Sequence, residues 1–215
     1  MQLRTRYPVL PSFADDAIIN YKQYKAMHNL AHDNPDVFWG EQAKQWLSWM
    51  KPFETVLEGD FKSETIAWFS GGELNVSFNC LDRHLATQGD KLALIWEGND
   101  PSEYRELTYT ELHQRVCQFS CVLKSQGIKP GDRIAIYMPM IPEVVIAMLA
   151  ATRIGAVHSV IFGGFSSDAL AARVKDASCK LLITVDEAPR GDKVIPFKEH
   201  VDKALLDCPS IERVI

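Results

Sequence analysis

The second half of the chain alternates between short apolar runs and longer segments whose apolar residues recur every three or four positions. This change of period predicts strands that alternate with helices. Strands are expected at residues 133–137, 156–162, 180–185 and 211–215, and helices at residues 142–154, 166–177 and 196–206. Elements in this order predict βαβ units and a parallel sheet. Because several of the strands are apolar throughout, we expect a doubly wound α/β sheet with helices on both faces.

The sequence also marks both ends of a helix that precedes the first of these strands. Thr108 and Glu111 have the spacing of a capping box, in which each side chain accepts a hydrogen bond from the backbone amide of the other residue. The helix continues through apolar residues at helical spacing, namely Leu112, Val116, Phe119 and Leu123. Gly127 then supplies a left-handed stop at the C-terminal end.

The first part of the chain lacks this alternation and is expected to be mainly helical. Residues 1–13 contain two prolines, which predict an irregular tail. Helices are expected at residues 14–30, 37–50 and 75–88, with loops and short strands at 52–72 and a strand at 91–96. Trp39, Trp46 and Trp49 fall near one face of the second helix. We expect them to pack this segment onto a larger body, and an exposed aromatic stripe for a partner is the alternative.

Composition and charge limit the partners of this chain. Of its 215 residues, 47% are hydrophobic and 24% are charged, which is ordinary for a globular protein with a sizeable core. The formal net charge of -5 argues against nucleic acid as the main partner, since a phosphate backbone requires concentrated Lys and Arg. A small phosphorylated ligand needs only a few local cations. Charged residues interrupt every longer apolar stretch, so neither a secretory signal nor a membrane span is expected.

The cysteines indicate the compartment. There are five of them, an odd number, and no CxxC pair or Cys/His cluster has the spacing of a zinc site. Reduced thiols in a cytoplasmic protein are therefore expected. No residue is assigned to a metal.

A pair of glycines follows one of the predicted strands, where a helix is expected to begin. Phe162, Gly163 and Gly164 lie at the carboxyl end of the strand, and Ser166 suits the N-cap of the helix. Ligands of open α/β sheets bind at the carboxyl ends of strands, and glycine lets a backbone approach closely. The free amides of a helix N-terminus favour an anion. A tight strand-to-helix turn with no ligand is the alternative.

A second candidate loop follows the next strand and holds two cations three residues apart. Arg190, Gly191, Asp192 and Lys193 form this loop, whose cations could clamp a phosphate. A solvated loop with locally balanced charges is the alternative, because three acidic residues lie nearby. In a doubly wound sheet both loops open at the same edge, so together they favour a phosphate-bearing ligand.

Several stretches of the sequence resemble the acetyl-CoA synthetase family of AMP-forming adenylating enzymes. They are residues 38–39, 73–84, 95–98, 131–143, 148–150, 153–166 and 184–187, and the resemblance covers about residues 20 to 215. It implies a large adenylating domain that begins at residue 81, preceded by the family's N-terminal helical segment at residues 14–80. Because the chain stops within a predicted strand, we expect it to be an N-terminal fragment of such an enzyme.

The resemblance implies a ligase that joins acetate to CoA. A carboxylate first attacks ATP, which is used with Mg2+, to give an acyl-adenylate and pyrophosphate, and the CoA thiol then takes the acyl group. The resemblance places Phe162, Gly163 and Gly164 along the CoA channel and residues 190–193 at the nucleotide phosphates of CoA. Relatives usually carry glycine at the position of Asp192, whose carboxylate could weaken phosphate binding.

The resemblance also indicates which parts of the active site are not found here. The Ser/Thr/Gly-rich loop that holds the ATP phosphates, the ribose-binding stretch and the catalytic lysine of the family have no counterpart in this sequence. No catalytic residue is assigned, and the chain alone is expected to be inactive. A propionyl-CoA synthetase, a non-catalytic CoA- or nucleotide-binding module and a purely structural domain are the alternatives. The expected partners are small molecules, and the sequence does not indicate an oligomeric state.

Overall fold

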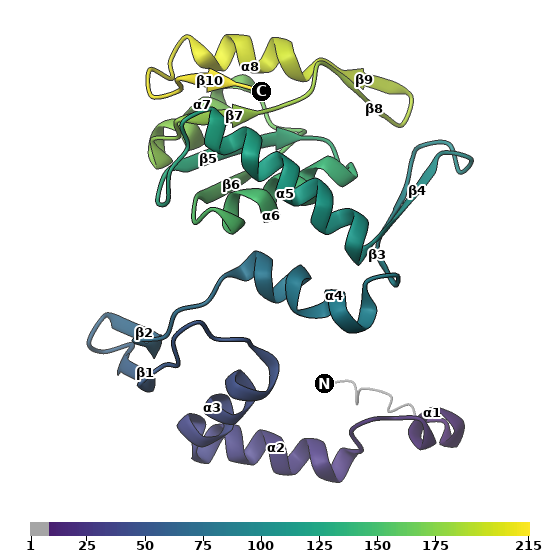
Figure 1. Ribbon diagram of the computed structural model, residues 1–215, viewed down its shortest axis with the longest axis vertical. Coiled ribbons are helices and arrows are strands. Elements are labelled where there is room, and N and C mark those ends of the chain that lie inside the picture. Colours follow the sequence, from purple (N-terminus) through teal and green to yellow (C-terminus); the bar gives the residue numbers. More distant parts are fainter. Residues whose placement is uncertain (1–8) are drawn as a thin grey trace, which may run out of the picture. The chain divides into compact units, whose positions relative to one another are not determined.

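The chain divides into two compact units, Met1–Glu73 and Leu74–Ile215 (Figure 1). The computed structural model describes residues 9–215, so most of the tail predicted at the N-terminus lies outside the described residues. The first unit contains α1 (Pro11–Asp15), α2 (Tyr21–Asp33) and α3 (Pro35–Trp46), followed by a hairpin of β1 (Thr55–Asp60) and β2 (Thr65–Ser70).

The boundaries of the first helices differ from the prediction. The helix predicted for residues 14–30 is two helices, because Asn20 caps the start of α2. The Asn20 side chain accepts a hydrogen bond from the Gln23 amide at 3.0 Å, and the Gln23 side chain accepts one from the Asn20 amide at 2.9 Å. Pro11 begins α1, so the prediction of an irregular tail is wrong from that residue onward.

Trp39, Trp46 and Trp49 do not share one packing face, and that prediction is wrong. The helix expected to carry them ends at Trp46, which keeps 62% of its surface exposed. Trp39 meets Trp68 edge-on with 6.3 Å between ring centroids, and Trp49 packs against Phe69 at 5.7 Å. Both partners lie on β2, so two of the three tryptophans pack onto the hairpin of their own unit.

The second unit contains the parallel sheet that the sequence predicts. Its first elements are the π-helical turn η1 (Phe78–Asp82), α4 (Arg83–Gln88), β3 (Leu92–Glu97), β4 (Tyr104–Thr108) and α5 (Tyr109–Ser125). These are followed by β5 (Arg133–Met138), α6 (Pro142–Arg153), β6 (Val157–Phe162), α7 (Ser167–Ala177), β7 (Leu181–Ile183), β8 (Ala188–Arg190), β9 (Lys193–Ile195), α8 (Phe197–Leu205) and β10 (Arg213–Val214). Four parallel strands form the sheet in the order β10-β7-β5-β6.

Helices cover both faces of this sheet, which confirms the doubly wound α/β fold (Figure 1). In the central strand β5, Ile134 and Ile136 join the core formed with α5 and α6. Ala135 and Tyr137 join the opposite core, formed with α7 and α8. Successive side chains of a strand point to opposite faces, so a strand covered on both sides must be apolar throughout. This requirement explains why the sequence signal of β5 is strong.

Both predicted ends of α5 are confirmed. The Glu111 amide donates to Thr108 Oγ1 at 3.2 Å, and the Thr108 amide donates to Glu111 Oε2 at 2.8 Å. Gly127 has a φ of 85°, and its amide donates to the Lys124 carbonyl at 3.0 Å. The left-handed glycine therefore ends the helix as the sequence indicates.

Two hairpins were not predicted. In the β3–β4 hairpin only the strand at residues 91–96 is predicted, and in the β8–β9 hairpin only a loop at residues 190–193 is predicted. The strands of the second hairpin have three residues each, and one of them contains Pro189, which weakens any strand pattern in the sequence. The second hairpin carries the predicted cationic residues.

Candidate functional site

The strand order places a topological switch point beside β5. The chain runs from β5 to β6 on one side of it and then crosses to β7 on the other side. Ligands of open α/β sheets bind outside the carboxyl ends of the strands at such a point. Both predicted loops follow these ends, with residues 162–164 at the end of β6 and residues 190–193 after β7.

A buried tyrosine holds the glycine loop that follows β6. The Tyr137 hydroxyl lies 2.8 Å from the Phe165 carbonyl and 3.4 Å from the Gly163 carbonyl, and it donates to them because carbonyls only accept. The hydroxyl oxygen lies 3.1 Å from His200 Nδ1, so this arrangement assigns a proton to that nitrogen. Burial raises the pKa of Tyr137, which keeps the hydroxyl protonated.

The first glycine of the loop is required by packing. A Cβ atom at Gly163 would lie 2.6 Å from the ring of Phe197, which is 2% exposed. After the loop, Ser166 Oγ accepts a hydrogen bond from the Ala169 amide at 3.4 Å, so the predicted N-cap of α7 is confirmed. Asp168 lies in the first turn of this helix. Its carboxylate would repel a phosphate placed at the N-terminus of α7. A phosphate that binds near this loop therefore needs positively charged side chains from another element.

The predicted cationic loop is a tight hairpin. β8 and β9 pair antiparallel with Arg190 directly opposite Lys193. Gly191 has a φ of 58° and is the first of the two turn residues, the position at which type II′ turns carry glycine. Residues directly opposite each other have Cβ atoms about 4.5–5.5 Å apart on one face. The hairpin therefore places the two cations side by side, with Asp192 at its tip.

The structure brings the two predicted loops together through Arg190. Its guanidinium lies over the ring of Phe162, with 5.2 Å from Cζ to the ring centroid. A Cβ atom at Gly164 would lie 2.7 Å from Arg190 Nη1 and 2.6 Å from the Phe162 ring. The second glycine thus leaves room for the guanidinium, and Phe162, Gly164 and Arg190 form one surface.

The cations of this surface are available to a ligand. Arg190 and Lys193 are exposed, and neither forms an ion pair with any residue between 9 and 215. The alternative to a phosphate clamp was a loop whose charges balance locally. The nearby acidic residues that the structure describes do not form ion pairs with these two cations. An anion that binds here does not have to displace a carboxylate from either cation. This arrangement is suited to a phosphate group, which accepts two hydrogen bonds from an arginine fork.

Two residues that support this site were not identified from the sequence. Tyr137 offered a signal, because a buried tyrosine hydroxyl in an otherwise aliphatic strand needs a hydrogen-bond partner. Asn99 offered none. It donates from Nδ2 to the Gly191 carbonyl at 3.4 Å and so links the β3–β4 turn to the second hairpin across 92 positions of sequence.

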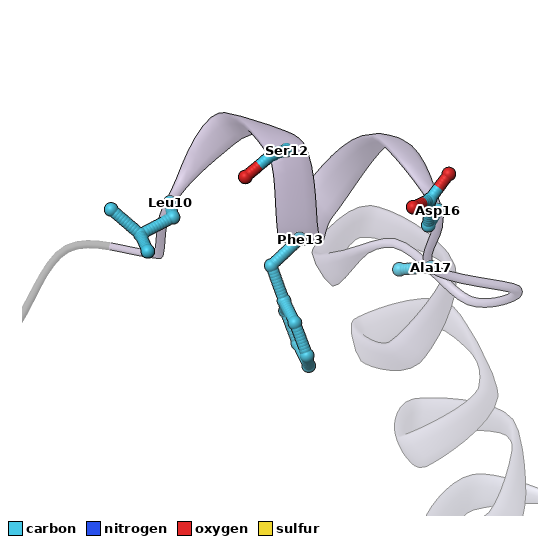
Figure 2. Close-up of a pocket in the computed structure, with 5 residues that line it drawn as sticks. All are labelled: Leu10, Ser12, Phe13, Asp16 and Ala17. Carbon is cyan, nitrogen blue, oxygen red and sulfur yellow. The ribbon is translucent and has the colours of Figure 1, made fainter.

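A separate hollow lies beside α1 in the first unit (Figure 2). Its lining residues are Leu10, Ser12, Phe13, Asp16 and Ala17. Their polar groups are one hydroxyl and one carboxylate, so they offer no cation to a phosphate. None of the predicted site residues lines this hollow.

The described residues were also searched for a membrane-spanning helix, a metal site and disulfides. Between residues 9 and 215, no helix is long and apolar enough to cross a membrane. Within the same range, no group of three or more His, Cys, Asp or Glu side chains is placed to hold a metal ion. All five cysteines are free.

Comparisons with known proteins agree with this architecture. A family model described as AMP-binding enzyme matches residues 81–214, and a model described as acetyl-coenzyme A synthetase N-terminus matches residues 24–80. Acetyl-coenzyme A synthetase 2 of Pseudomonas aeruginosa is 51% identical over 97% of this chain. Acetyl-coenzyme A synthetase of Magnetococcus marinus is 51% identical over 95% of it.

A solved structure shows the same fold. Acetoacetyl-CoA synthetase from Streptomyces lividans superposes with a TM-score of 0.81 and 27% identity, covering 89% of this chain and 29% of that chain. The present chain likewise spans 32% of the length of both bacterial acetyl-coenzyme A synthetases. On the match at residues 81–214, which is more than half of its length, the chain belongs to the AMP-binding enzyme family.

Proposed function

We propose that this chain is the N-terminal third of an AMP-forming acetate–CoA ligase and that it supplies the site for the phosphates of CoA. The observation that carries this proposal is the position of Arg190, whose guanidinium lies against Gly164 and over Phe162 with no ion pair to a described residue. The similarity to two bacterial acetyl-coenzyme A synthetases supports the activity of the whole enzyme.

Each residue of the site has a distinct role in this proposal. Arg190 binds a CoA phosphate with two parallel hydrogen bonds, and Lys193, directly opposite in the hairpin, adds a point charge. Phe162, Gly163 and Gly164 line the path of CoA, and Gly164 leaves room for the Arg190 guanidinium. Asp192, at the tip of the hairpin, places a carboxylate beside the cations and reduces the affinity for phosphate.

The reaction of the whole enzyme proceeds in two steps. An acetate oxygen attacks the α-phosphorus of ATP, and pyrophosphate leaves to give acetyl-AMP. Mg2+ bound to ATP would neutralise charge on its phosphates. The CoA thiolate then attacks the acetyl carbon, and AMP leaves. The first step needs fixed charges around the ATP phosphates. We assign none of those groups to the present residues, and we propose that the chain alone catalyses neither step.

The proposal extends to domain organisation and compartment. Residues 81–215 form the first part of the adenylating domain and residues 14–80 its N-terminal segment, which the two family matches support. The five free cysteines support a reducing, cytoplasmic location.

Calorimetric titration of charge variants with CoA tests the proposed site. Arg190→Gln is expected to weaken CoA binding by roughly tenfold to a hundredfold, because a hydrogen bond to a charged group contributes about 1.5–3 kcal/mol. Lys193→Gln is expected to have a smaller effect, since a lysine ammonium cannot form the two parallel hydrogen bonds of a guanidinium. Lys124→Gln, which removes an exposed cation from α5, is the matched control. Equal CoA affinity in the Arg190 variant and this control would contradict the proposal.

A further inference from the structure

A second arginine lies at the opposite end of a stack of side chains that begins at Arg190. The Arg173 guanidinium lies over the ring of Phe165, with 4.4 Å from Cζ to the centroid. The Phe165 ring meets the Phe162 ring edge-on, with 5.7 Å between centroids and an interplanar angle of 78°. The Phe162 ring in turn lies under Arg190 at 5.2 Å. The four side chains therefore form a continuous stack in which two rings lie between two cations.

Each contact in this stack has a favourable geometry. A guanidinium within about 6 Å of a ring centroid is attracted to the ring face. Edge-to-face rings are favoured at centroid distances of about 4.5–7 Å. Arg173 is also fixed from its own helix, because its Nη1 donates to the Ala169 carbonyl at 3.1 Å. The Phe165 backbone is fixed by the hydrogen bond from Tyr137.

The other end of the stack has fewer constraints. No hydrogen bond or ion pair with any residue between 9 and 215 orients the Arg190 guanidinium. Phe162 keeps 55% of its surface exposed, so packing alone leaves its ring free to turn. The ring of Phe165 is the aromatic contact that orients the Phe162 ring. The direction of the Arg190 fork therefore depends on these two rings and on Arg173 of α7, which lies over Phe165.

We propose that Arg173 is a positioning residue for Arg190, acting through Phe165 and Phe162. The inference rests on the proposed CoA-phosphate site, because the function of the stack is to hold the Arg190 fork where a phosphate binds. Arg173 itself does not touch the phosphate. Preorganisation of this kind raises affinity by reducing the side-chain entropy lost on binding.

The first test observes the stack without any ligand. Protons above a ring face are shifted by the ring current, so the side-chain NMR signals of Arg190 report its position over Phe162. Arg173→Gln is expected to move these signals toward the values of an unstructured arginine, whereas Lys175→Gln is not. Lys175 lies on the same helix, so the control removes the same charge from α7. Unchanged Arg190 signals in Arg173→Gln would overturn the inference.

Two ring variants separate positioning from a general structural effect. Phe165→Leu keeps an apolar side chain but removes the ring face, and it is expected to shift the Arg190 signals as Arg173→Gln does. Phe165→Tyr keeps the ring and is expected to leave the Arg190 signals as they are in the unmodified chain. Equal effects of the two substitutions would overturn the inference.

The second test measures CoA affinity by calorimetry. Arg173→Gln is expected to weaken binding roughly two- to fivefold, as for an exposed cation–ring contact, and to have no further effect when combined with Arg190→Gln. An equal loss in both backgrounds would overturn the inference, because Arg173 would then act independently of Arg190. If Arg190→Gln itself leaves CoA affinity unchanged, the proposed function fails. If it weakens binding while Arg173→Gln does not, only the positioning role fails.

Discussion

At the scale of single residues, Gly163 and Gly164 are neighbours in sequence that face different surroundings. A Cβ atom at Gly164 would meet the Arg190 guanidinium and the exposed ring of Phe162. Both groups can move, so Gly164→Ala is expected to change the free energy of unfolding by less than about 0.5 kcal/mol. It is also expected to displace Arg190 and weaken CoA binding, which calorimetric titration can measure.

Gly163→Ala is the contrasting control for this prediction. Its added methyl group would meet the ring of Phe197, which is buried and cannot yield. We expect a loss of about 1–3 kcal/mol in the free energy of unfolding, measured by urea denaturation, as for overpacking in a core.

The prediction for Gly164→Ala is contradicted if this variant binds CoA as tightly as the unmodified chain. The contact between Gly164 and Arg190 would then not affect CoA binding.

The residues of the site could be predicted from the sequence only as far as their loops. Phe162, Gly164 and Arg190 follow neighbouring strands of a doubly wound sheet, and the sequence places such loops at one edge. The stacking of Arg190 on Phe162 could not be predicted, because it depends on side-chain directions that the hairpin sets. The antiparallel pairing of Arg190 with Lys193 was not predicted either, because the short strand β8 contains Pro189.

At the scale of elements, an ionic cluster ties η1 to α5 and α6. Asp82 accepts two hydrogen bonds from Arg153, at 2.7 and 2.9 Å, and lies 3.2 Å from His113 Nε2. The hydrogen bonds from Arg153 hold the pKa of Asp82 below its ordinary value of 3.8. Folding therefore favours the charged carboxylate.

This shift predicts how stability depends on pH. Since the pKa of Asp82 is lower in the folded state, its contribution is fully present above the ordinary value of 3.8 and is lost as the pH falls through the folded pKa. Asp82→Asn is expected to cost about 1–2 kcal/mol of unfolding free energy at pH 7, less than for a fully buried pair. The difference between the two proteins should shrink below pH 4, as urea denaturation at several pH values can show.

A matched variant controls for the loss of one negative charge. Asp176→Asn removes an exposed carboxylate of α7 and is expected to leave stability within about 0.5 kcal/mol at each pH. A stability difference for Asp82→Asn that stays constant from pH 7 to pH 3 would contradict the role assigned to the carboxylate charge.

The success of element prediction follows the physical strength of each signal. Strand β5 and helix α5 were predicted because burial on both faces and a capping box leave clear marks. The break before α2 also had a signal in the capping box of Asn20 and Gln23, which was overlooked. Strand β8, with three residues and Pro189, left no pattern that could be distinguished from a loop.

At the scale of the whole molecule, the chain is similar to one part of longer enzymes. It spans 32% of the length of the bacterial acetyl-coenzyme A synthetases that it resembles. The described site offers cations but no groups that we assign to adenylation. We therefore propose that this part of the enzyme recognises CoA and does not carry out the chemistry, with Arg190 and Lys193 as a clamp for a CoA phosphate.

A calorimetric titration of the unmodified chain with CoA and, in parallel, with 3′-dephospho-CoA tests the proposed phosphate clamp. The two ligands differ by one phosphate group, so their difference in affinity isolates the clamp. We predict that CoA binds roughly tenfold or more tightly than 3′-dephospho-CoA, as expected for a charge-assisted contact. Equal affinity for the two ligands, or no binding of either, would rule out the phosphate clamp at Arg190 and Lys193.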